Sequence, residues 1–323
     1  MRRYYLAVVT LAAVTLAAVA LSSCARPRTE PSIMQQGSAH TAGLHGRVTD
    51  HVVVISIDGL RPDAIEKYDA RTIKRLMHEG RYSLTAQTIT TSLTLPSHTS
   101  MLTGVGADVH GVTRNSDKTK EKGFVKVPTI FGLAHASGFT TAAFFSKTKF
   151  HHLEIPSTLD FSRSPKGGLD PMFSEERVTG YVAQYLEHAS PNLMFVHLME
   201  PDFIGHQFGW MGHMYGMAVR EADLGVKRVL EQADEHFGRG NYTVILTADH
   251  GGHNKTHGTT DSRDMTIPWI VWGAGVQPGD TLSGIRTMDT AATVMWLLGV
   301  DTPASWVGQP VAKAFQATLV SGR

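Results

Sequence analysis

The sequence predicts an α/β fold, a three-layer sandwich in which a mostly parallel central sheet is flanked by helices. Two observations predict it. From about residue 49 onward, short apolar runs alternate with longer stretches of helical period. The apolar runs are also continuous rather than alternating in polarity, which is typical of strands that are buried on both faces of a parallel sheet.

Each element is expected from its own pattern of apolar and β-branched residues. The expected strands are 52–57, 140–145, 193–199, 242–247 and 267–272. The expected helices are 71–79, 127–136, 174–189, 212–236 and 288–298. Together they predict one domain over residues 49–323, without an internal repeat.

The N-terminus is typical of a bacterial lipoprotein signal. Arg2 and Arg3 precede the apolar run 6–21, which is shorter than the roughly 20 residues of a permanent membrane helix. Leu-Ser-Ser then precedes Cys24, as in a lipobox, so we expect residues 1–23 to be a signal peptide and Cys24 to carry the lipid. An uncleaved anchor is the alternative. Residues 24–48 are interpreted as a tether that places the domain in the cell envelope, on the periplasmic or extracellular side.

Composition excludes several classes of function. The chain has 30 basic and 29 acidic residues, a net charge of +1 and a single cysteine. We therefore expect no binding to a nucleic-acid duplex, no intramolecular disulfide, no cysteine-based zinc knuckle and no iron–sulfur cluster. The oligomeric state is left open.

Acidic residues follow three of the expected strands. Asp58 ends the first, Asp202 and His206 follow the third, and Asp249 with His250 ends the fourth. The carboxyl ends of such strands meet at one edge of the sheet, where three carboxylates repel one another unless cations neutralise them. A pair of divalent metal ions would supply this neutralising charge. Mixed Asp and His ligands suit Zn²⁺, with Mn²⁺ or Fe as alternatives.

Each of these residues also has a simpler interpretation. An Asp after a strand often only caps a helix or forms a turn. His253 is ambiguous as a ligand because it lies close to Asp249 in the sequence. The histidines interpreted as structural or surface residues are His98, His110, His151, His152 and His213.

Thr94 is the candidate nucleophile. It precedes Pro96 by two residues, and the stretch that follows is compatible with a helix ending at Gly104. This places Thr94 just before a helix N-terminus, where backbone N–H groups and the helix dipole attract anions. A threonine hydroxyl becomes a competent nucleophile when a metal lowers its pKa. The alternative is that Thr94 only caps the helix.

The order of these residues resembles the alkaline phosphatase superfamily, and specifically its type I phosphodiesterase/nucleotide pyrophosphatase branch. The resemblance runs from about residue 51 to the tail. The motifs that carry it are Asp58, Thr94-x-Pro-x-His, His110-Gly-x-x-x-Asn115, Asp202-x-x-x-His206, Asp249-His250-Gly and His257-Gly.

The resemblance implies a dinuclear phosphoester hydrolase. It implies that one metal is held by Asp58, Asp249 and His250 beside Thr94. It implies that the second is held by Asp202, His206 and His257. Asn115 matches the asparagine that binds a phosphoryl oxygen. Two divalent ions, with Zn²⁺ expected, would act on a small-molecule phosphate ester through a phosphothreonine intermediate.

Lys147 and Lys149 bear on the substrate. They lie at the end of the strand expected over 140–145, where phosphomonoesterases and phosphonoacetate hydrolases of this superfamily carry a pair of cations. Two added cations favour the dianion of a monoester, so we expect a slight preference for phosphomonoesters. A phosphodiesterase/nucleotide pyrophosphatase and a phosphonoacetate-type hydrolase are the alternatives. The simpler interpretation is that both lysines are solvated at the end of the strand, which would remove the basis for this preference.

The sequence disfavours two further functions. A sulfatase needs Cys or Ser where this chain has Thr94, and Arg where it has His98, so sulfatase chemistry is disfavoured. A non-catalytic, metal-stabilised binding lipoprotein would be expected to lack a ligand or the nucleophile, and none is missing.

Overall fold

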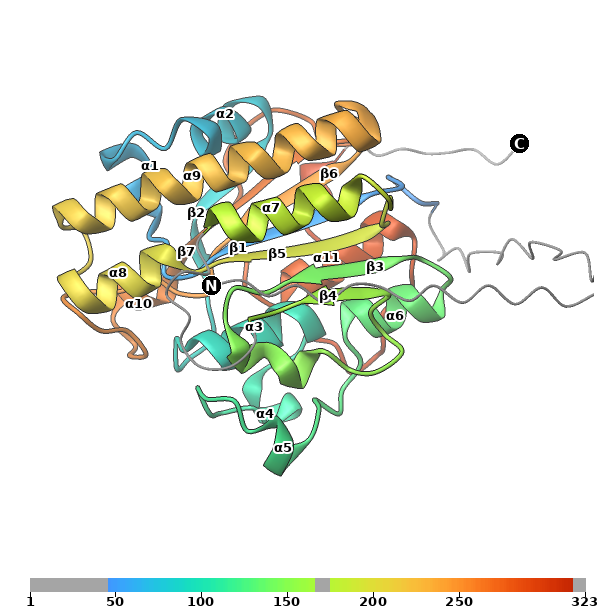
Figure 1. Ribbon diagram of the computed structural model, residues 1–323, viewed down its shortest axis with the longest axis horizontal. Coiled ribbons are helices and arrows are strands. Elements are labelled where there is room, and N and C mark those ends of the chain that lie inside the picture. Colours follow the sequence, from blue (N-terminus) through green and yellow to red (C-terminus); the bar gives the residue numbers. More distant parts are fainter. Residues whose placement is uncertain (1–45, 166–174, 316–323) are drawn as a thin grey trace, which may run out of the picture. The chain divides into compact units, whose positions relative to one another are not determined.

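Seven strands form one sheet in the computed structural model, which describes residues 46–165 and 175–315 (Figure 1). Their order is β2-β7-β6-β1-β5-β3-β4. The pairs β1–β5, β1–β6, β3–β5 and β3–β4 are parallel, whereas β7 is antiparallel to both β6 and β2. The strands are β1 Val52–Ile57, β2 Arg81–Gln87, β3 Thr141–Phe144, β4 Phe161–Arg163, β5 Leu193–Leu198, β6 Thr243–Thr247 and β7 Thr266–Gly273. The expected mostly parallel α/β sheet is confirmed.

Helices cover both faces of this sheet. The α-helices are α1 Pro62–Lys67, α2 Arg71–Glu79, α3 Thr94–Thr103, α4 Ala107–His110, α5 Thr119–Lys122, α6 Ile130–Ala136, α7 Glu175–Leu186, α8 Glu200–Phe208, α9 His213–Ala233, α10 Ser262–Met265 and α11 Asp289–Leu298. A π-helix, η2 Asp234–Gly238, continues α9, and η1 Thr148–Leu153 and η3 Ala312–Ala314 are 3₁₀-helices.

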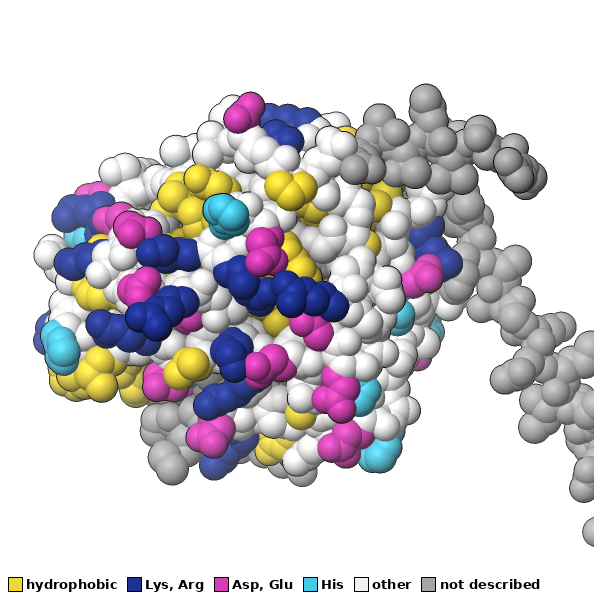
Figure 2. Space-filling view, turned by 90° about the horizontal axis from the view of Figure 1, so that it is seen from above, with side chains coloured by type: hydrophobic (Ala, Val, Ile, Leu, Met, Phe, Trp, Pro, Cys, Tyr) yellow, Lys and Arg dark blue, Asp and Glu magenta, His cyan; other side chains and the backbone are white. Residues whose placement is uncertain are grey.

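The helices form two layers. One face of the sheet carries α1, α2, α7 and α9, and the other carries α3, α6 and α11 (Figure 1). The central strands β1, β5 and β6 are buried along their whole length, which explains their continuous apolar sequences. On the face with α2 and α9, Lys and Arg side chains lie among Asp and Glu (Figure 2), as in the ion pair of Lys227 with Glu231.

The antiparallel end of the sheet accommodates a proline. Pro268 lies inside β7 and lacks a backbone N–H group, so it cannot donate to a neighbouring strand. The register of β2 shifts between Ser83 and Ala86, directly opposite this proline. The edge strand β2 therefore forms a β-bulge at the position where β7 has no N–H group to donate.

The structure adds elements that the sequence did not predict. These are the edge strands β2 and β4, the helices α1, α4, α5, α8 and α10, and the 3₁₀-helices η1 and η3. The signal peptide 1–23, Cys24 and the tether up to residue 45 lie outside the described residues. Among the described residues, none of the helices is long and apolar enough to span a bilayer.

Candidate active site

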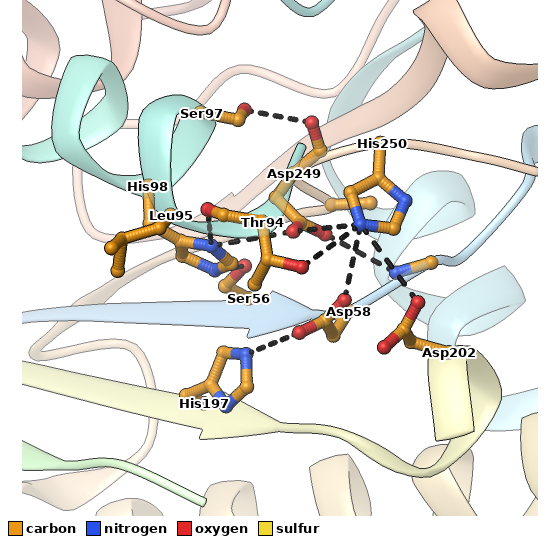
Figure 3. Close-up of polar contacts among 12 residues, drawn as sticks. Ser56, Asp58, Thr94, Leu95, Ser97, His98, His197, Asp202, Asp249 and His250 are labelled. Carbon is orange, nitrogen blue, oxygen red and sulfur yellow. Dashed lines mark hydrogen bonds and ion pairs between the residues drawn. The ribbon is translucent and has the colours of Figure 1, made fainter. Parts of the chain in front are cut away.

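The carboxyl ends of three neighbouring strands bring the predicted carboxylates together (Figure 3). Asp58 follows β1, Asp249 follows β6, and Asp202 lies in the first turn of α8, directly after β5. The backbone N–H of Asp202 donates to the carbonyl of Asp58 at 3.0 Å, which ties the start of α8 to the end of β1. All three carboxylates are buried.

Close approach of the backbone is required at Gly59. Its φ of +72° is in the left-handed region, and a Cβ atom there would lie 2.9 Å from the Cα of Asp202. The N–H of Gly59 also donates to Oδ1 of Asp249 at 3.2 Å. This glycine therefore lets two of the carboxylates approach the end of β1.

Three histidines surround the carboxylates. His206 lies one helical turn after Asp202 on α8, and its Nε2 is 3.4 Å from Oδ1 of Asp202. Nε2 of His257 is also 3.4 Å from that oxygen, although His257 comes from the loop between β6 and α10. The ring of His257 stacks on His250 with a centroid distance of 3.6 Å. Residues far apart in the sequence thus share one small volume.

Backbone carbonyls fix the orientation of each of these imidazoles. Nδ1 of His250 binds the carbonyl of Gly251 at 2.7 Å, that of His257 binds Ser92 at 2.8 Å, and that of His206 binds Lys255 at 3.0 Å. A carbonyl accepts a hydrogen, so Nδ1 carries a proton in each ring and Nε2 is the nitrogen that faces the carboxylates. This is how metal-binding histidines are held.

One oxygen of each carboxylate has no hydrogen-bond donor among the described residues. These are Oδ1 of Asp58, Oδ1 of Asp202 and Oδ2 of Asp249. Each lies 3.2–3.4 Å from an Nε2 atom of His206, His250 or His257. Two ligands at about 2.0–2.1 Å from a tetrahedral zinc lie about 3.3 Å apart, so the donor set fits divalent metal ions.

The candidate ligand atoms form two groups. Asp202, His206 and His257 make one, which is the set that the family resemblance implied. The other joins Asp58 and His250 with Asp202, and Oδ2 of Asp249 lies 3.2 Å from Nε2 of His250. Asp202 therefore lies between the two groups.

Lys147 provides the cation in this cluster. Its Nζ is 2.6 Å from Oδ2 of Asp58 and 2.5 Å from Oδ2 of Asp202. Burial favours the neutral carboxyl of Asp58, but Lys147 and His197 outweigh it and hold the pKa well below its usual range. Burial likewise opposes the charge on His250, yet Asp249 and Asp58 raise its pKa to about 9. Charges therefore outweigh desolvation at Asp58 and His250, whereas at His257 burial prevails and lowers the pKa to about 4.

Thr94 lies beside this cluster, but its place on the helix differs from the prediction. It is the first helical residue of α3, and Leu93, in an extended conformation, is the N-cap. Thr94 therefore does not cap the helix, because a side chain inside the first turn cannot fold back onto the N–H groups that a cap satisfies. Its Oγ1 is fully buried and lies 3.3 Å from Nε2 of His250.

Asn115 and Lys149 lie on the other side of Thr94. Oδ1 of Asn115 accepts from the backbone N–H of Leu95 at 3.1 Å and from Nζ of Lys149 at 3.2 Å. Asn115 and Lys149 line a cavity of about 360 Å³ together with Thr94, Lys147, Asp202, His206 and His257. The predicted pair of lysines is thus divided, because Lys147 binds carboxylates whereas Lys149 faces Asn115.

Other histidines have defined partners. His253 binds the buried carboxylate of Asp264 at 2.7 Å and lies in neither ligand group. His98, which was interpreted as a structural or surface histidine, is buried beside a carboxylate. Its Nδ1 is 3.3 Å from Oδ2 of Asp249, and its two nitrogens bind the carbonyl of Thr94 and the hydroxyl of Ser56.

His197 was missed by the sequence analysis. It lies within β5 and binds Oδ2 of Asp58 at 3.0 Å (Figure 3). The available signal was a histidine near the carboxyl end of the otherwise apolar strand LMFVHL. A buried polar residue in such a strand needs partners, and here they lie at the site.

This fold and this site together define a class of α/β proteins in which aspartates and histidines at strand ends converge beside a hydroxyl at the start of a helix. The family model described as type I phosphodiesterase / nucleotide pyrophosphatase matches residues 52–261. The chain belongs to this family. The expectation that it acts on phosphoric ester bonds agrees with that membership.

Curated relatives match over parts of their length. Human GPI ethanolamine phosphate transferase 1 is 25% identical over 276 residues, covering 76% of this chain and 29% of the relative. The bovine bis(5'-adenosyl)-triphosphatase ENPP4 is 25% identical over 222 residues, covering 62% of this chain and 47% of the relative. The chain thus spans less than half the length of either.

Solved structures share the fold. Human ectonucleotide pyrophosphatase / phosphodiesterase 5 superposes with a TM-score of 0.70 at 15% identity, covering 83% of this chain and all of the other. An inactive murine form of that protein, in complex with AMP, gives 0.67 at 15% identity and covers 79% and 96%. A 2-O GAG sulfatase gives 0.68 at 17% identity, covering 83% and 74%.

Proposed function

We propose that this protein is a metal-dependent phosphoester hydrolase with Thr94 as its nucleophile. One observation carries the proposal. Three buried carboxylates each direct one oxygen, which no donor of residues 46–165 or 175–315 reaches, toward imidazole Nε2 atoms beside a buried threonine hydroxyl at the start of a helix. A cluster of this composition supports metal-assisted transfer of a phosphoryl group.

Two divalent ions, with Zn²⁺ expected, complete the site in this proposal. Asp58, Asp249 and His250 would hold one, and Asp202, His206 and His257 the other. When bound, such ions lower the pKa of a nearby hydroxyl and stabilise negative charge on phosphoryl and leaving oxygens. Mixed carboxylate and imidazole donors are typical of zinc sites.

The protein's own groups then perform the transfer. Oγ1 of Thr94 forms a bond to phosphorus, the ester P–O bond breaks, and the alcohol leaves with a proton. Water next attacks the phosphothreonine, which restores the hydroxyl and releases phosphate. The backbone N–H of Leu95 donates to Oδ1 of Asn115 in this structure. In the reaction, this N–H and the amide nitrogen of Asn115 would bind phosphoryl oxygens.

Lys149 supports a preference for phosphomonoesters. Its Nζ lies beside Asn115 in the cavity, where it would meet an additional anionic oxygen of a monoester dianion. Lys147 supports this preference less than the sequence suggested, because its ammonium group already forms ion pairs with Asp58 and Asp202. The preference thus depends on one lysine.

A phosphodiester is the second candidate substrate. Uncharged side chains line another part of the cavity, namely Met199, Phe203, Gln207 and Thr148. Such a wall can hold a second ester substituent, and an aromatic ring can stack on a base. The bovine relative is a bis(5'-adenosyl)-triphosphatase, and the murine structure contains AMP.

Replacing Lys149 with alanine distinguishes the two candidates. We expect kcat/KM for phenyl phosphate to fall about 10–100-fold, because a charge-assisted hydrogen bond to the dianion is lost, and kcat/KM for bis(4-nitrophenyl) phosphate to fall less than about 3-fold. Steady-state kinetics with zinc-loaded enzyme measure both. Lys149→Arg should retain most of the phenyl phosphate activity, and Lys118→Ala, at an exposed lysine, controls for loss of surface charge. Equal losses on both substrates would contradict the monoester preference.

We further propose that the domain is a lipoprotein of the cell envelope, anchored through Cys24. The support is the charged, apolar and small-residue order of residues 1–24. A Cys24→Ser variant expressed in a Gram-negative host should lose labelling by palmitate and leave the membrane fraction. Unchanged labelling would contradict the lipidation of Cys24.

A further inference from the structure

His197 is a polar side chain in an apolar surrounding. It is the last but one residue of β5 and is fully buried. Its ring packs edge-on against Phe150 at a centroid distance of 4.7 Å and against His98 at 4.9 Å. A polar ring in such a place is retained only if both of its nitrogens have partners.

Both partners belong to the candidate site. Nε2 lies 3.0 Å from Oδ2 of Asp58, and Nδ1 lies 2.5 Å from the hydroxyl of Ser146. A carboxylate can only accept, so Nε2 carries the hydrogen and Nδ1 accepts from Ser146. Burial lowers the pKa of His197 to about 4, which agrees with a neutral ring. The donors therefore run in one direction, from Ser146 to His197 to Asp58.

This chain of donors determines which oxygen of Asp58 is available. Oδ2 receives two donors, His197 and Lys147, the latter at 2.6 Å. Oδ1 has no hydrogen-bond donor among the described residues and lies 3.3 Å from Nε2 of His250. Rotating the carboxylate would break both bonds to Oδ2. The geometry thus assigns one oxygen to the protein and the other to a ligand.

We propose that His197, oriented by Ser146, is a positioning residue that holds Asp58 with Oδ1 directed toward the metal. This inference rests on the proposed function in one respect, that Asp58 is a metal ligand. Partners of ligating side chains typically contribute about 10–100-fold to metal affinity. Lys147 alone would not replace His197, because a flexible ammonium group shared with Asp202 fixes no direction at Asp58.

The test measures zinc affinity by competition with a chromogenic chelator. His197→Phe preserves a ring among aromatic neighbours but removes the donor, and we expect zinc affinity to fall about 10–100-fold. His197→Gln places an amide N–H close to the position of Nε2 and should restore affinity to within about 5-fold, while His197→Asn, which is too short to reach Asp58, should not. Ser146→Ala should give an intermediate loss, because it leaves Nδ1 without a donor.

His152 provides a matched control. It is also a buried histidine, and it binds the hydroxyl of Thr99 at 2.8 Å without contacting a proposed metal ligand. His152→Phe should lower thermal stability to a similar degree but leave zinc affinity unchanged. If His197→Phe does not fold, the comparison of His197→Gln with His197→Asn still decides.

The outcomes separate this inference from the proposed function. If the wild-type protein binds no zinc, the proposed function fails. If it binds zinc and the Gln and Asn variants bind it equally tightly, the positioning role of His197 is overturned. Tighter zinc binding by His197→Gln, which retains an N–H donor, than by His197→Asn supports the positioning role. Excess zinc should then restore much of the kcat of His197→Phe.

Discussion

Replacing Thr94 with alanine is expected to lower kcat for phenyl phosphate by at least about 10³-fold, because the oxygen that forms the covalent bond to phosphorus is removed. Oγ1 of Thr94 is fully buried and lies 3.3 Å from Nε2 of His250, within the proposed metal site. Steady-state kinetics with zinc-loaded enzyme measure the loss. Because α3 begins at Thr94 without a side-chain cap, the helix should remain folded in the variant.

Two controls make this result specific to the hydroxyl. Thr94→Ser retains the oxygen and should keep activity within about 100-fold of the wild type, the remaining loss arising from a freer rotamer. Acid quenching of a reaction with labelled substrate should trap a phosphoprotein in the wild type and none in Thr94→Ala. A Thr94→Ala enzyme that turns over at the wild-type rate, with its zinc content intact, would rule out the covalent step.

Replacing Asp249 with asparagine is expected to change stability in opposite directions with and without metal. Oδ2 of Asp249 is buried without a hydrogen-bond donor among the described residues, in a cluster where Lys147 faces Asp58 and Asp202. Removing one of three negative charges should raise the free energy of unfolding of the metal-free protein by about 1 kcal/mol. With zinc at 100 times its Kd, the wild type gains about 2.7 kcal/mol that a non-binding variant does not.

Urea unfolding measures the change in the free energy of unfolding, once in the presence of EDTA and once in the presence of zinc. Activity should fall at least about 10²-fold in the variant, because a ligand beside the nucleophile is lost. Asp264→Asn is the matched control, since this buried carboxylate has all its partners within the protein, including His253 and the hydroxyl of Thr259. It should destabilise the protein in both conditions. Equal destabilisation by Asp249→Asn would argue against a metal at this carboxylate.

The elements with continuous apolar or amphipathic sequences were predictable because local patterns determine them. The strand expected over 52–57 matches β1, and the helix expected over 212–236 matches α9 extended by a π-turn. The edge strands β2 and β4 were not predictable in this way. The sequence of β2 is polar and interrupted by a bulge, and it becomes a strand because β7 offers hydrogen-bonding groups to pair with. Its structure depends on a partner almost 200 residues away.

The sequence by itself identified the proposed metal ligands and the candidate nucleophile. Carboxylates at the ends of apolar runs, histidines after them, and Thr94 before a helix-compatible stretch could all be read along the chain, since strand ends and helix starts are local features. Their order also sufficed to recognise the family, which the match over residues 52–261 establishes.

Only the tertiary structure decided how these groups act on one another. It directed the ammonium group of Lys147 to Asp58 and Asp202 and that of Lys149 to Asn115, and it brought His197 of β5 to Asp58. It also oriented each imidazole through a carbonyl from another segment or a neighbouring residue. Hydrogen bonds and ion pairs act over a few ångströms between residues distant in sequence, so their partners are determined by the packing of the sheet and its helices and not by any local pattern.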